Sequence, residues 1–424
     1  MPATKIGTDN NLLRKLLSVP FWEKENAMNV LTFNCGSSSL KYRLYGMPEE
    51  IELAGGEAQR VGPKTTEPAR IIHRVKGRSE EVVFVEMRNH NEAFEQVMKL
   101  LAREKELQPQ VAGHRLVHGG ERLQNVTVMN PQMIAALPEL NALAPIHNPP
   151  IVALIQACQA RYPALPQVGV SDTAFHATIP PRARTYALPR ALSEELGLHK
   201  YGFHGISHQY VVTEAAKFLK LPLDKFNAVS CHLGSGGASL CAVSGGKSVD
   251  NTFGYSPLQG LVMSTRCGDL DPAVTLQLLA RANGESAAVE NLLNRKSGVL
   301  GLSGLSADIR DVLGGADGGS KQLNTAAQIY LWRMRKYLGA YLAVVGNADA
   351  VIFTDTIGEL VPRVRAAVCA NLECFGLKID ENLNNHVTKY PADIAAAGSA
   401  ARILVILTNE ELSIARSTYA ALAA

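Results

Sequence analysis

Short apolar runs separated by polar turns dominate the first part of the chain. The runs VLTFN, KYRLYGM and VVFVEM (82–87) have the β-branched and aromatic content typical of strands. Segment 91–107 instead repeats apolar residues at spacings of three and four, which predicts an amphipathic helix. QVAGHRLVHGG (110–120) then predicts a strand that ends in a glycine turn.

A second series of the same kind begins with QVGVSDTAFH at residue 167. It continues in NAVSCHLGSGGASLCAVSGGKSVD (227–250) and ADAVIFTDTIGEL (348–360), and the apolar segment 326–346 between them predicts a helix. Strands interspersed with helices indicate an α/β protein. The sequence of strand, Gly/Ser turn and strand occurs at 34–39 and again at 231–239, which hints at a duplicated architecture.

Composition narrows the classes of function. A chain of 424 residues suggests two or three domains, and 46% hydrophobic with 19% charged residues indicates a globular protein with a core. The net charge of +3 is too balanced to predict nucleic-acid or anionic-membrane partners. No apolar run reaches the roughly 18–20 residues of a membrane-spanning helix.

The termini and cysteines point to a cytoplasmic protein. Residues 1–27 are polar and predict an N-terminal extension without a signal-peptide core, because Arg14 and Lys15 interrupt its one apolar run. The seven cysteines are scattered without any CxxC spacing, so neither a disulfide framework nor a zinc site is expected.

Two turns could hold phosphate. FNCGSSSLKY (33–42) offers backbone N–H groups, hydroxyls and a lysine, and CHLGSGGAS (231–239) offers three glycines that allow close backbone approach. A solvated hairpin remains the alternative reading of each turn. The long polar loop after residue 250, with Asp250, Arg266 and Asp269, is more typical of a functional segment.

Histidine, arginine and aspartate recur in four short motifs: GHRLVHGG, APIHNPP, SDTAFH and YGFHGISH. None has the spacing of a transition-metal site. Arginines and carboxylates near two Gly/Ser turns suit phosphoryl transfer, which requires charge stabilisation more than a covalent nucleophile. Carboxylates would then hold Mg²⁺ through oxygen ligands.

Nine blocks together resemble the acetate kinase family in order and spacing, from about Met28 to Arg416. They are FNCGSSSLK, GHRLVHGGE, LAPIHNPP, DTAFH, YGFHGISH, HLGSGGAS, SPLQGLVMSTRCGDLDP, KSGVLGLSG and TNEELSIAR. The resemblance implies two duplicated ribonuclease-H-like (actin-type) α/β domains with an interdomain active-site cleft. The first would comprise 28–174 plus about 411–424, and the second 175–410.

The resemblance also implies the reaction. A homodimer would interconvert ATP plus acetate with ADP plus acetyl phosphate, using Mg²⁺ or alternatively Mn²⁺. Arg115, Asp172, His204 and Arg266 would be catalytic, with His204 and Arg266 stabilising the transition state. Asn34 and Glu410 would hold the metal. Acetate would contact Arg115, Val117, Ile146, His147, Phe203 and Pro257.

Phosphate and nucleotide would contact a larger set of residues. These are Asn34, Ser37, Ser39, Lys41, His232, Leu233, Gly234, Ser235, Gly236, Asp308, Ile309, Arg310, Asp355, Thr356, Ile357, Gly358, Glu359 and Leu360. A small apolar pocket discriminates a methylene weakly, by about 1–3 kcal/mol. A short-chain acyl kinase that uses propionate is therefore an alternative.

This sequence departs from the family pattern in the segment that is expected to bind the nucleotide. The family loop reads roughly FTGGIGEN, whereas here FTDTIGEL carries Asp355, Thr356 and Leu360. Where the family has glycine, the loop backbone can lie close to the nucleotide, and a side chain at the same position would occupy that space. Three interpretations stay open: ATP is still bound, the phosphoryl donor has changed, or the chain is a non-catalytic relative that binds an acyl phosphate or a nucleotide.

Overall fold

The computed structural model describes residues 27–36, 38–63, 66–121, 123–144 and 148–423. By its contacts the chain divides into two compact units. One contains the described residues up to Ala174 and the segment from Glu410 onward, and the other is Phe175–Asn409. The predicted extension 1–27 lies almost entirely outside the described residues.

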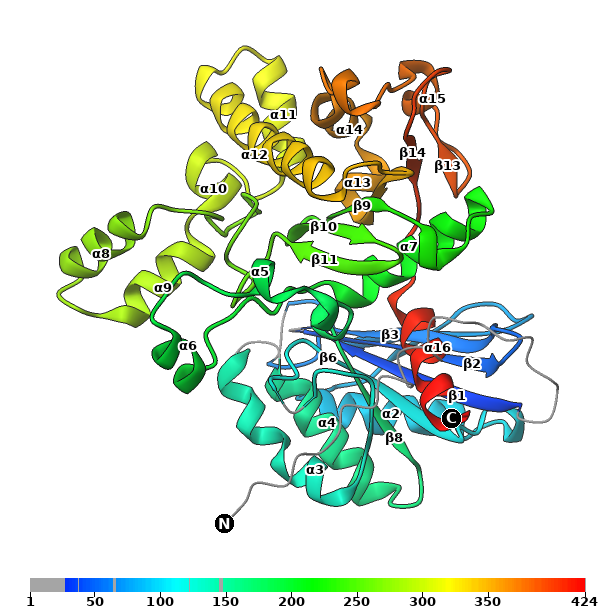
Figure 1. The fold of residues 1–424 in the computed structure, drawn as a ribbon. Coiled ribbons are helices and arrows are strands. Elements are labelled where there is room, and N and C mark those ends of the chain that lie inside the picture. The colour runs from blue at the N-terminus through cyan, green and yellow to red at the C-terminus, as the bar shows by residue number, and fades with distance from the viewer. Residues whose placement is uncertain (1–26, 37, 64–65, 122, 145–147, 424) are drawn as a thin grey trace. The chain divides into compact units, whose positions relative to one another are not determined.

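Eight strands form the sheet of the first unit, in the order β5-β4-β3-β2-β1-β6-β8-β7 (Figure 1). Strands β1 to β5 pair as an antiparallel meander, whereas β1, β6 and β8 are parallel neighbours. The bounds are β1 Met28–Cys35, β2 Ser39–Met47, β3 Ile51–Gln59, β4 Arg70–Val75, β5 Glu81–Phe84, β6 Val111–Leu116, β7 Thr127–Met129 and β8 Gln167–Ser171.

Helices cover both faces of this sheet. The helices α2 (His90–Leu101) and α4 (Asn148–Arg161) pack against one face, where they join the core around Phe33 and Phe94. Helix α16 (Glu410–Ala423) packs on β1, β6 and β8. Gly113 of β6 faces α16, because a Cβ there would meet Thr418 at 2.3 Å. Short helices α3 (Pro131–Ala136), Lys105–Leu107 and Leu137–Leu143 complete the unit.

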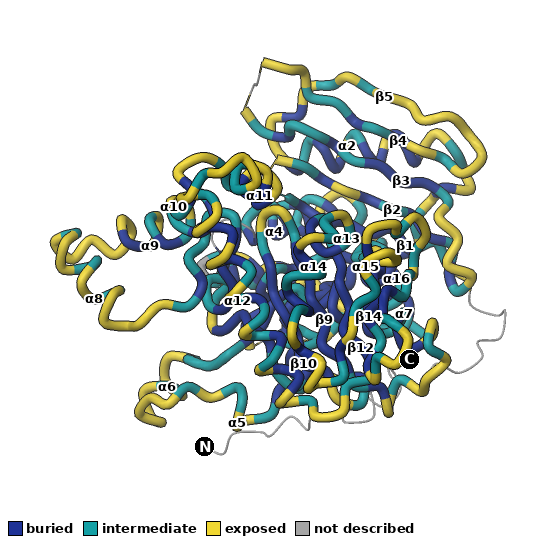
Figure 2. Tube along the Cα trace, turned by 90° about the horizontal axis from the view of Figure 1, so that it is seen from above, coloured by how far each residue is buried: buried dark blue, intermediate teal, exposed yellow. Residues whose placement is uncertain are grey.

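The second unit has a six-stranded mixed sheet in the order β11-β10-β9-β12-β14-β13. The bounds are β9 Ala228–Leu233, β10 Ala238–Ser244, β11 Lys247–Asn251, β12 Ala350–Thr354, β13 Ala392–Asp393 and β14 Arg402–Val405. Strands β9, β12 and β14 are parallel and buried, as Figure 2 shows in dark blue, and β9 to β11 are antiparallel.

Two long helices pack on this sheet. Helix α7 (Gly205–Leu219) lies on β9 and β12, and α12 (Lys321–Val345) lies on β9 and β10. The other helices are α5 Pro181–Arg184, α6 Arg190–Leu196, α8 Pro272–Arg281, α9 Ser286–Arg295, α10 Gly298–Ser303, α11 Ile309–Asp317, α13 Asp355–Leu360, α14 Pro362–Cys369 and α15 Glu381–Asn385, with one-turn helices at Ala174–Thr178, Leu223–Lys225 and Glu373–Phe375.

The predicted α/β class is confirmed, and element ends differ from the predictions in several places. Helix α12 begins earlier than 326, because the Ser320 side chain accepts a hydrogen bond from the Leu323 N–H and so caps the helix. Helix α2 ends at Leu101 rather than 107. Within the described residues, none of the helices is both long and apolar enough to span a bilayer.

Candidate active site

Arg115 is the centre of a polar cluster in the first unit. The parallel pairing of β1 with β6 sets Phe33 opposite His114, so the next residues, Asn34 and Arg115, lie side by side. The Arg115 Nη1 donates to the Asn34 Oδ1 at 3.0 Å. Strand register therefore brings together two residues that the sequence assigned to the same site.

Asp172 holds the other side of this guanidinium. It follows β8, the parallel neighbour of β6, and is 1% exposed. Its Oδ2 accepts from the Arg115 Nη2 at 2.6 Å and from the Nε at 3.2 Å. Burial lowers the pKa of Arg115, but the charges of Asp172 and Glu410 outweigh it and hold that pKa above its ordinary value.

Two acidic residues at the start of α16 complete the cluster. The Asn34 Nδ2 donates to the Glu410 Oε2 at 3.2 Å and to the Glu411 Oε1 at 3.3 Å. Glu410 also lies 3.7 Å from Arg115. The sequence assigned a role to Glu410 and missed Glu411, although the EE pair that opens the helix was visible in TNEELSIAR.

The remaining predicted residues of this unit are less closely involved. Ser39 begins β2, Lys41 is exposed and pairs in the ladder with Asn34, and Val117 is half-buried just after β6. Ser37, Ile146 and His147 lie outside the described residues.

A loop after β6 is fixed by side chains that the sequence did not single out for this purpose. The Asn148 side chain is fully buried, accepts from the His118 N–H at 3.3 Å and donates to the His118 carbonyl at 3.0 Å. The Ser171 hydroxyl accepts from the Gly119 N–H at 3.1 Å. These bonds orient the segment that follows Arg115.

The glycine-rich turn between β9 and β10 forms the second cluster, in the second unit. The Gly234 N–H donates to the Gly237 carbonyl at 2.9 Å and closes the turn. The Arg266 guanidinium lies against it, because a Cβ on Gly237 would meet the Arg266 Nη2 at 2.6 Å. Arg266 donates to the carbonyls of Pro257 at 2.7 Å and Gly236 at 3.2 Å.

Arg266 is a half-buried cation held by neutral acceptors. Burial is what lowers its pKa, to about 10. Its Cζ lies 5.7 Å from the centroid of the Phe253 ring. A half-buried guanidinium over a glycine turn is suited to bind an incoming anion, since the anion restores electrostatic stabilisation lost on burial.

Two histidines lie next to this turn. His204 precedes α7 in the left-handed region, with φ of 60°, and its ring centroid is 4.1 Å from that of His232. The His204 Nδ1 is 3.0 Å from the Ser239 hydroxyl, and the His232 Nδ1 is 2.8 Å from the Ser207 hydroxyl. Phe203 is buried against Phe253.

FTDTIGEL differs from the expected loop, because its last six residues, Asp355–Leu360, form helix α13. The Asp355 Oδ2 lies 3.0 Å from the His232 Nε2, and Glu359 accepts from the Asp355 N–H at 2.8 Å. Gly358 packs over β9, and Leu360 is 60% exposed. The predicted nucleotide segment thus lies beside the glycine turn at its Asp355 end and reaches the surface at its Leu360 end.

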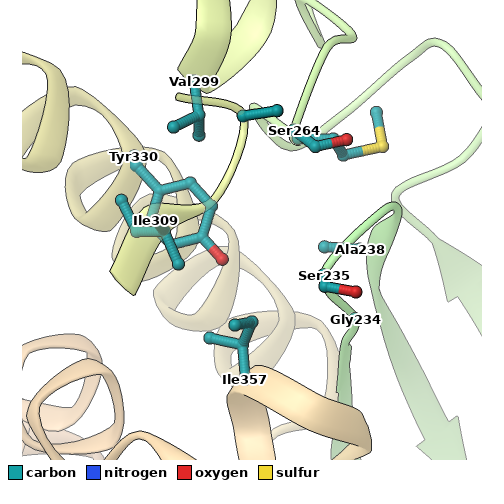
Figure 3. A pocket seen from close by; sticks show the side chains of 10 residues that line it. Gly234, Ser235, Ala238, Ser264, Val299, Ile309, Tyr330 and Ile357 are labelled. Carbon is teal, nitrogen blue, oxygen red and sulfur yellow. The ribbon is translucent and has the colours of Figure 1, made fainter. Parts of the chain in front are cut away.

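A small cavity adjoins the glycine turn (Figure 3). Ile309, Tyr330 and Ile357 point toward it from α11, α12 and α13, and Ser235 borders it from the turn. Its volume is about 10 Å³. Asp308 caps α11 and pairs with Arg310, which holds the pKa of that carboxyl below its usual value.

Comparison with known proteins shows which family the chain belongs to. Residues 29–416 match the acetokinase family. The chain belongs to this family. The acetate kinase of Alkaliphilus metalliredigens is 44% identical over 397 residues, which are 92% of this chain and 99% of that relative.

Solved structures of the family have the same fold. The Porphyromonas gingivalis acetate kinase aligns with a TM-score of 0.83 and 35% identity, covering 93% of this chain and 100% of that one. A propionate kinase from Francisella tularensis also aligns with a TM-score of 0.83 and 35% identity, covering 92% and 99%. As a member of this family the chain is a phosphotransferase with a carboxyl group as acceptor.

Proposed function

We propose that the chain transfers a phosphoryl group reversibly between ATP and acetate, forming acetyl phosphate and ADP. The observation that carries this proposal is Arg266, a half-buried guanidinium held by carbonyls over a glycine turn. Such a group stabilises the charge of a phosphoryl group in transfer.

The chemistry explains why arginines matter more here than a nucleophile. An acetate oxygen forms a bond to the γ-phosphorus while the bond from that phosphorus to the ADP oxygen breaks. Acetate is already ionised at neutral pH, so the step needs no proton acceptor. The protein has to neutralise and align negative groups, which is the role we assign to Arg115 and Arg266.

We assign supporting roles to the neighbouring residues. His204, beside the glycine turn, donates a hydrogen bond to the phosphoryl oxygens. Asp172 fixes the orientation of Arg115 through its two contacts at 2.6 and 3.2 Å. Val117, Phe203 and Pro257 bound the acetate methyl.

A divalent cation fits the donor chemistry of the first cluster. No group of three or more His, Cys, Asp or Glu in the described part of the chain is arranged to hold a metal. Mg²⁺ is commonly bound by one or two carboxylates together with substrate phosphates and water. Glu410 and Asn34 provide such a partial set, and the ion would neutralise charge on the transferred phosphates, with Mn²⁺ as a substitute.

A hydroxamate assay for acetyl phosphate tests the proposal, with purified protein, acetate, Mg²⁺ and ATP, GTP, CTP or pyrophosphate offered separately. Arg266→Ala and Arg115→Ala should each lower kcat/KM by a factor on the order of 10²–10³. Arg190→Ala, an arginine with a 91% exposed side chain, is the matched control and should change little. Activity unaffected by Arg266→Ala would overturn the assignment.

Propionate is the second candidate acceptor, because a propionate kinase aligns as well as an acetate kinase. The ratio of kcat/KM for the two acids decides between them, and one methylene is worth about 10–200-fold. A non-catalytic relative would instead give no product with any donor, while ADP still raised the melting temperature.

We also infer a cytoplasmic homodimer from the family resemblance. Helix α12 leaves the large apolar side chains Ile329 and Trp332 exposed, at 37% and 68%, three residues apart on one face. Light scattering on the purified chain tests the oligomeric state, and a monomer at micromolar concentration would contradict it.

A further inference from the structure

Asp355 has an unusual backbone conformation for a residue with a side chain. It directly follows β12, and its φ is 62°, in the left-handed region. Among residues other than glycine, asparagine and aspartate tolerate this region best. The conformation turns the chain from β12 into α13 and places the carboxylate beside the glycine turn.

Several hydrogen bonds hold the carboxylate in this place. Its Oδ2 lies 3.0 Å from the His232 Nε2, and its Oδ1 accepts from the Thr356 N–H at 2.6 Å. Burial raises the pKa of Asp355, but the contacts with His232 and Thr356 outweigh it and keep the pKa well below its usual range. The carboxylate is therefore charged at neutral pH.

A closed ring of hydrogen bonds supports the Asp355–His232 pair from behind. His232 contacts the Ser207 hydroxyl at 2.8 Å, which contacts the Thr408 hydroxyl at 2.8 Å. The Thr408 N–H donates to Glu359 at 3.2 Å, and Glu359 accepts from the Asp355 N–H at 2.8 Å. Reorienting the carboxylate would disturb the whole ring, so its charge is fixed in place.

The carboxylate fills the space beside the glycine turn. A Cβ on Gly234 would lie 2.4 Å from the Asp355 Oδ2, whereas a Cβ on Gly237 would meet Arg266. One end of the turn is thus next to a fixed negative charge, and the other end is next to a positive one. Phosphates that bind along the turn meet attraction at Gly237 and repulsion at Gly234.

The neighbouring cavity gives a nucleotide little compensation. At about 10 Å³ it has room for roughly one water molecule. A base could enter only if Ile309, Tyr330 or Ile357 moved. Affinity for the donor then depends strongly on its phosphates, which are the groups that Asp355 repels.

We propose that the Asp355 carboxylate weakens the binding of the donor's phosphates at the Leu233–Gly237 turn. This inference rests on the proposed function, since it takes the turn to be where the donor's phosphates bind. Asp355 acts through its charge, and its removal should strengthen the binding of a nucleotide.

Calorimetric titration of MgADP into the full chain tests this proposal. Asp355→Asn keeps the size of the side chain and tolerates the left-handed backbone, so it isolates the charge. We expect it to lower the Kd for MgADP by about tenfold at low ionic strength, with a smaller effect in high salt. Asp355→Gly should strengthen MgADP binding to a similar extent. It replaces Asp355→Asn in the measurement if that variant folds poorly.

Asp317→Asn is the matched control, because it removes a carboxylate of the same unit that is 65% exposed and paired with Arg363. Its Kd for MgADP should stay within about twofold of the parent. Unchanged or weaker MgADP binding in both Asp355 variants would overturn the inference.

Binding and turnover separate the two proposals. Stronger MgADP binding by the Asp355 variants, with no acetyl phosphate formed from any donor, would refute the proposed function and leave the inference standing. Acetyl phosphate formed in an Arg266-dependent way, with binding unaffected at Asp355, would refute the inference alone.

Discussion

Arg115 and Arg266 are arginines in two different electrostatic settings. Arg115 is balanced by Asp172 and Glu410, which raise its pKa, whereas Arg266 is held by carbonyls and burial lowers its pKa to about 10. The first guanidinium is fixed by charge before any ligand arrives. The second gains its strongest partner when an anion binds.

Substitutions of Asp172 test whether the orientation of Arg115 matters for activity. Asp172→Ala should lower kcat/KM by a factor on the order of 10², because the guanidinium loses two contacts that fix its direction. Asp172→Asn keeps an acceptor oxygen and should lower it less. We would measure steady-state kinetics and the urea midpoint of both.

The stability lost when Asp172 is replaced can be compared with the stability lost when a surface ion pair is broken. Leaving Arg115 without its Asp172 partner should cost about 1–3 kcal/mol of unfolding free energy. Glu50→Gln, which breaks the surface pair with Arg416, should cost under about 1 kcal/mol. Equal kinetics for Asp172→Ala and the parent would contradict the positioning role.

At the scale of elements, the end of α13 depends on a buried arginine from the next helix. Arg365 of α14 is 0% exposed and donates to the carbonyls of Gly358 and Glu359 at 2.9 and 2.8 Å. It also donates to the Asn384 side chain and carbonyl, at 2.7 and 2.8 Å. These bonds satisfy carbonyls at the C-terminal end of α13, which an isolated short helix would leave exposed.

Arg365→Met should therefore destabilise the second unit. Four buried acceptor contacts would lose their donors, so we expect a loss of about 3 kcal/mol or more in unfolding free energy. Urea denaturation measures it. Arg363→Met, two residues away and paired with Asp317 at the surface, should change the midpoint little. Similar effects of the two variants would show that the buried bonds contribute nothing.

At the scale of the whole molecule, buried neutral histidines make stability depend on pH. Desolvation lowers the pKa of His114 to about 3 and that of His176 to about 4, and it also lowers the pKa of His208. Below about pH 6.5 the unfolded chain binds protons that the folded chain excludes, so stability falls as the pH falls. Glu359, whose pKa is raised by burial, acts in the opposite direction.

Unfolding free energy should fall by roughly 2 kcal/mol for each of His114 and His176 between pH 7 and pH 5. Urea titrations across this range check the slope. His114→Phe keeps the stack on Phe33, whose ring centroid is 5.6 Å away, and removes one titrating group, so its slope should be shallower. A stability that does not change with pH would contradict the prediction.

The motif blocks predicted the family, and the alternation of strands with helices predicted the α/β class; both are confirmed. This was possible because turns, apolar runs and charged motifs are local features of the sequence. Element ends were predicted less well. FTDTIGEL gave no sign of helix α13, because the bonds that stabilise its end come from Arg365 and not from the segment itself.

Only the tertiary structure decided what Asp355 contacts. The sequence showed that Asp355 departs from the family loop, but it did not show which residue Asp355 contacts. In the parallel pairing of β12 with β9, Thr354 lies opposite His232, so the next residue reaches the His232 ring. Register between strands whose paired residues are 122 positions apart depends on the packing of both strands in one sheet, and no local pattern in either strand specifies it.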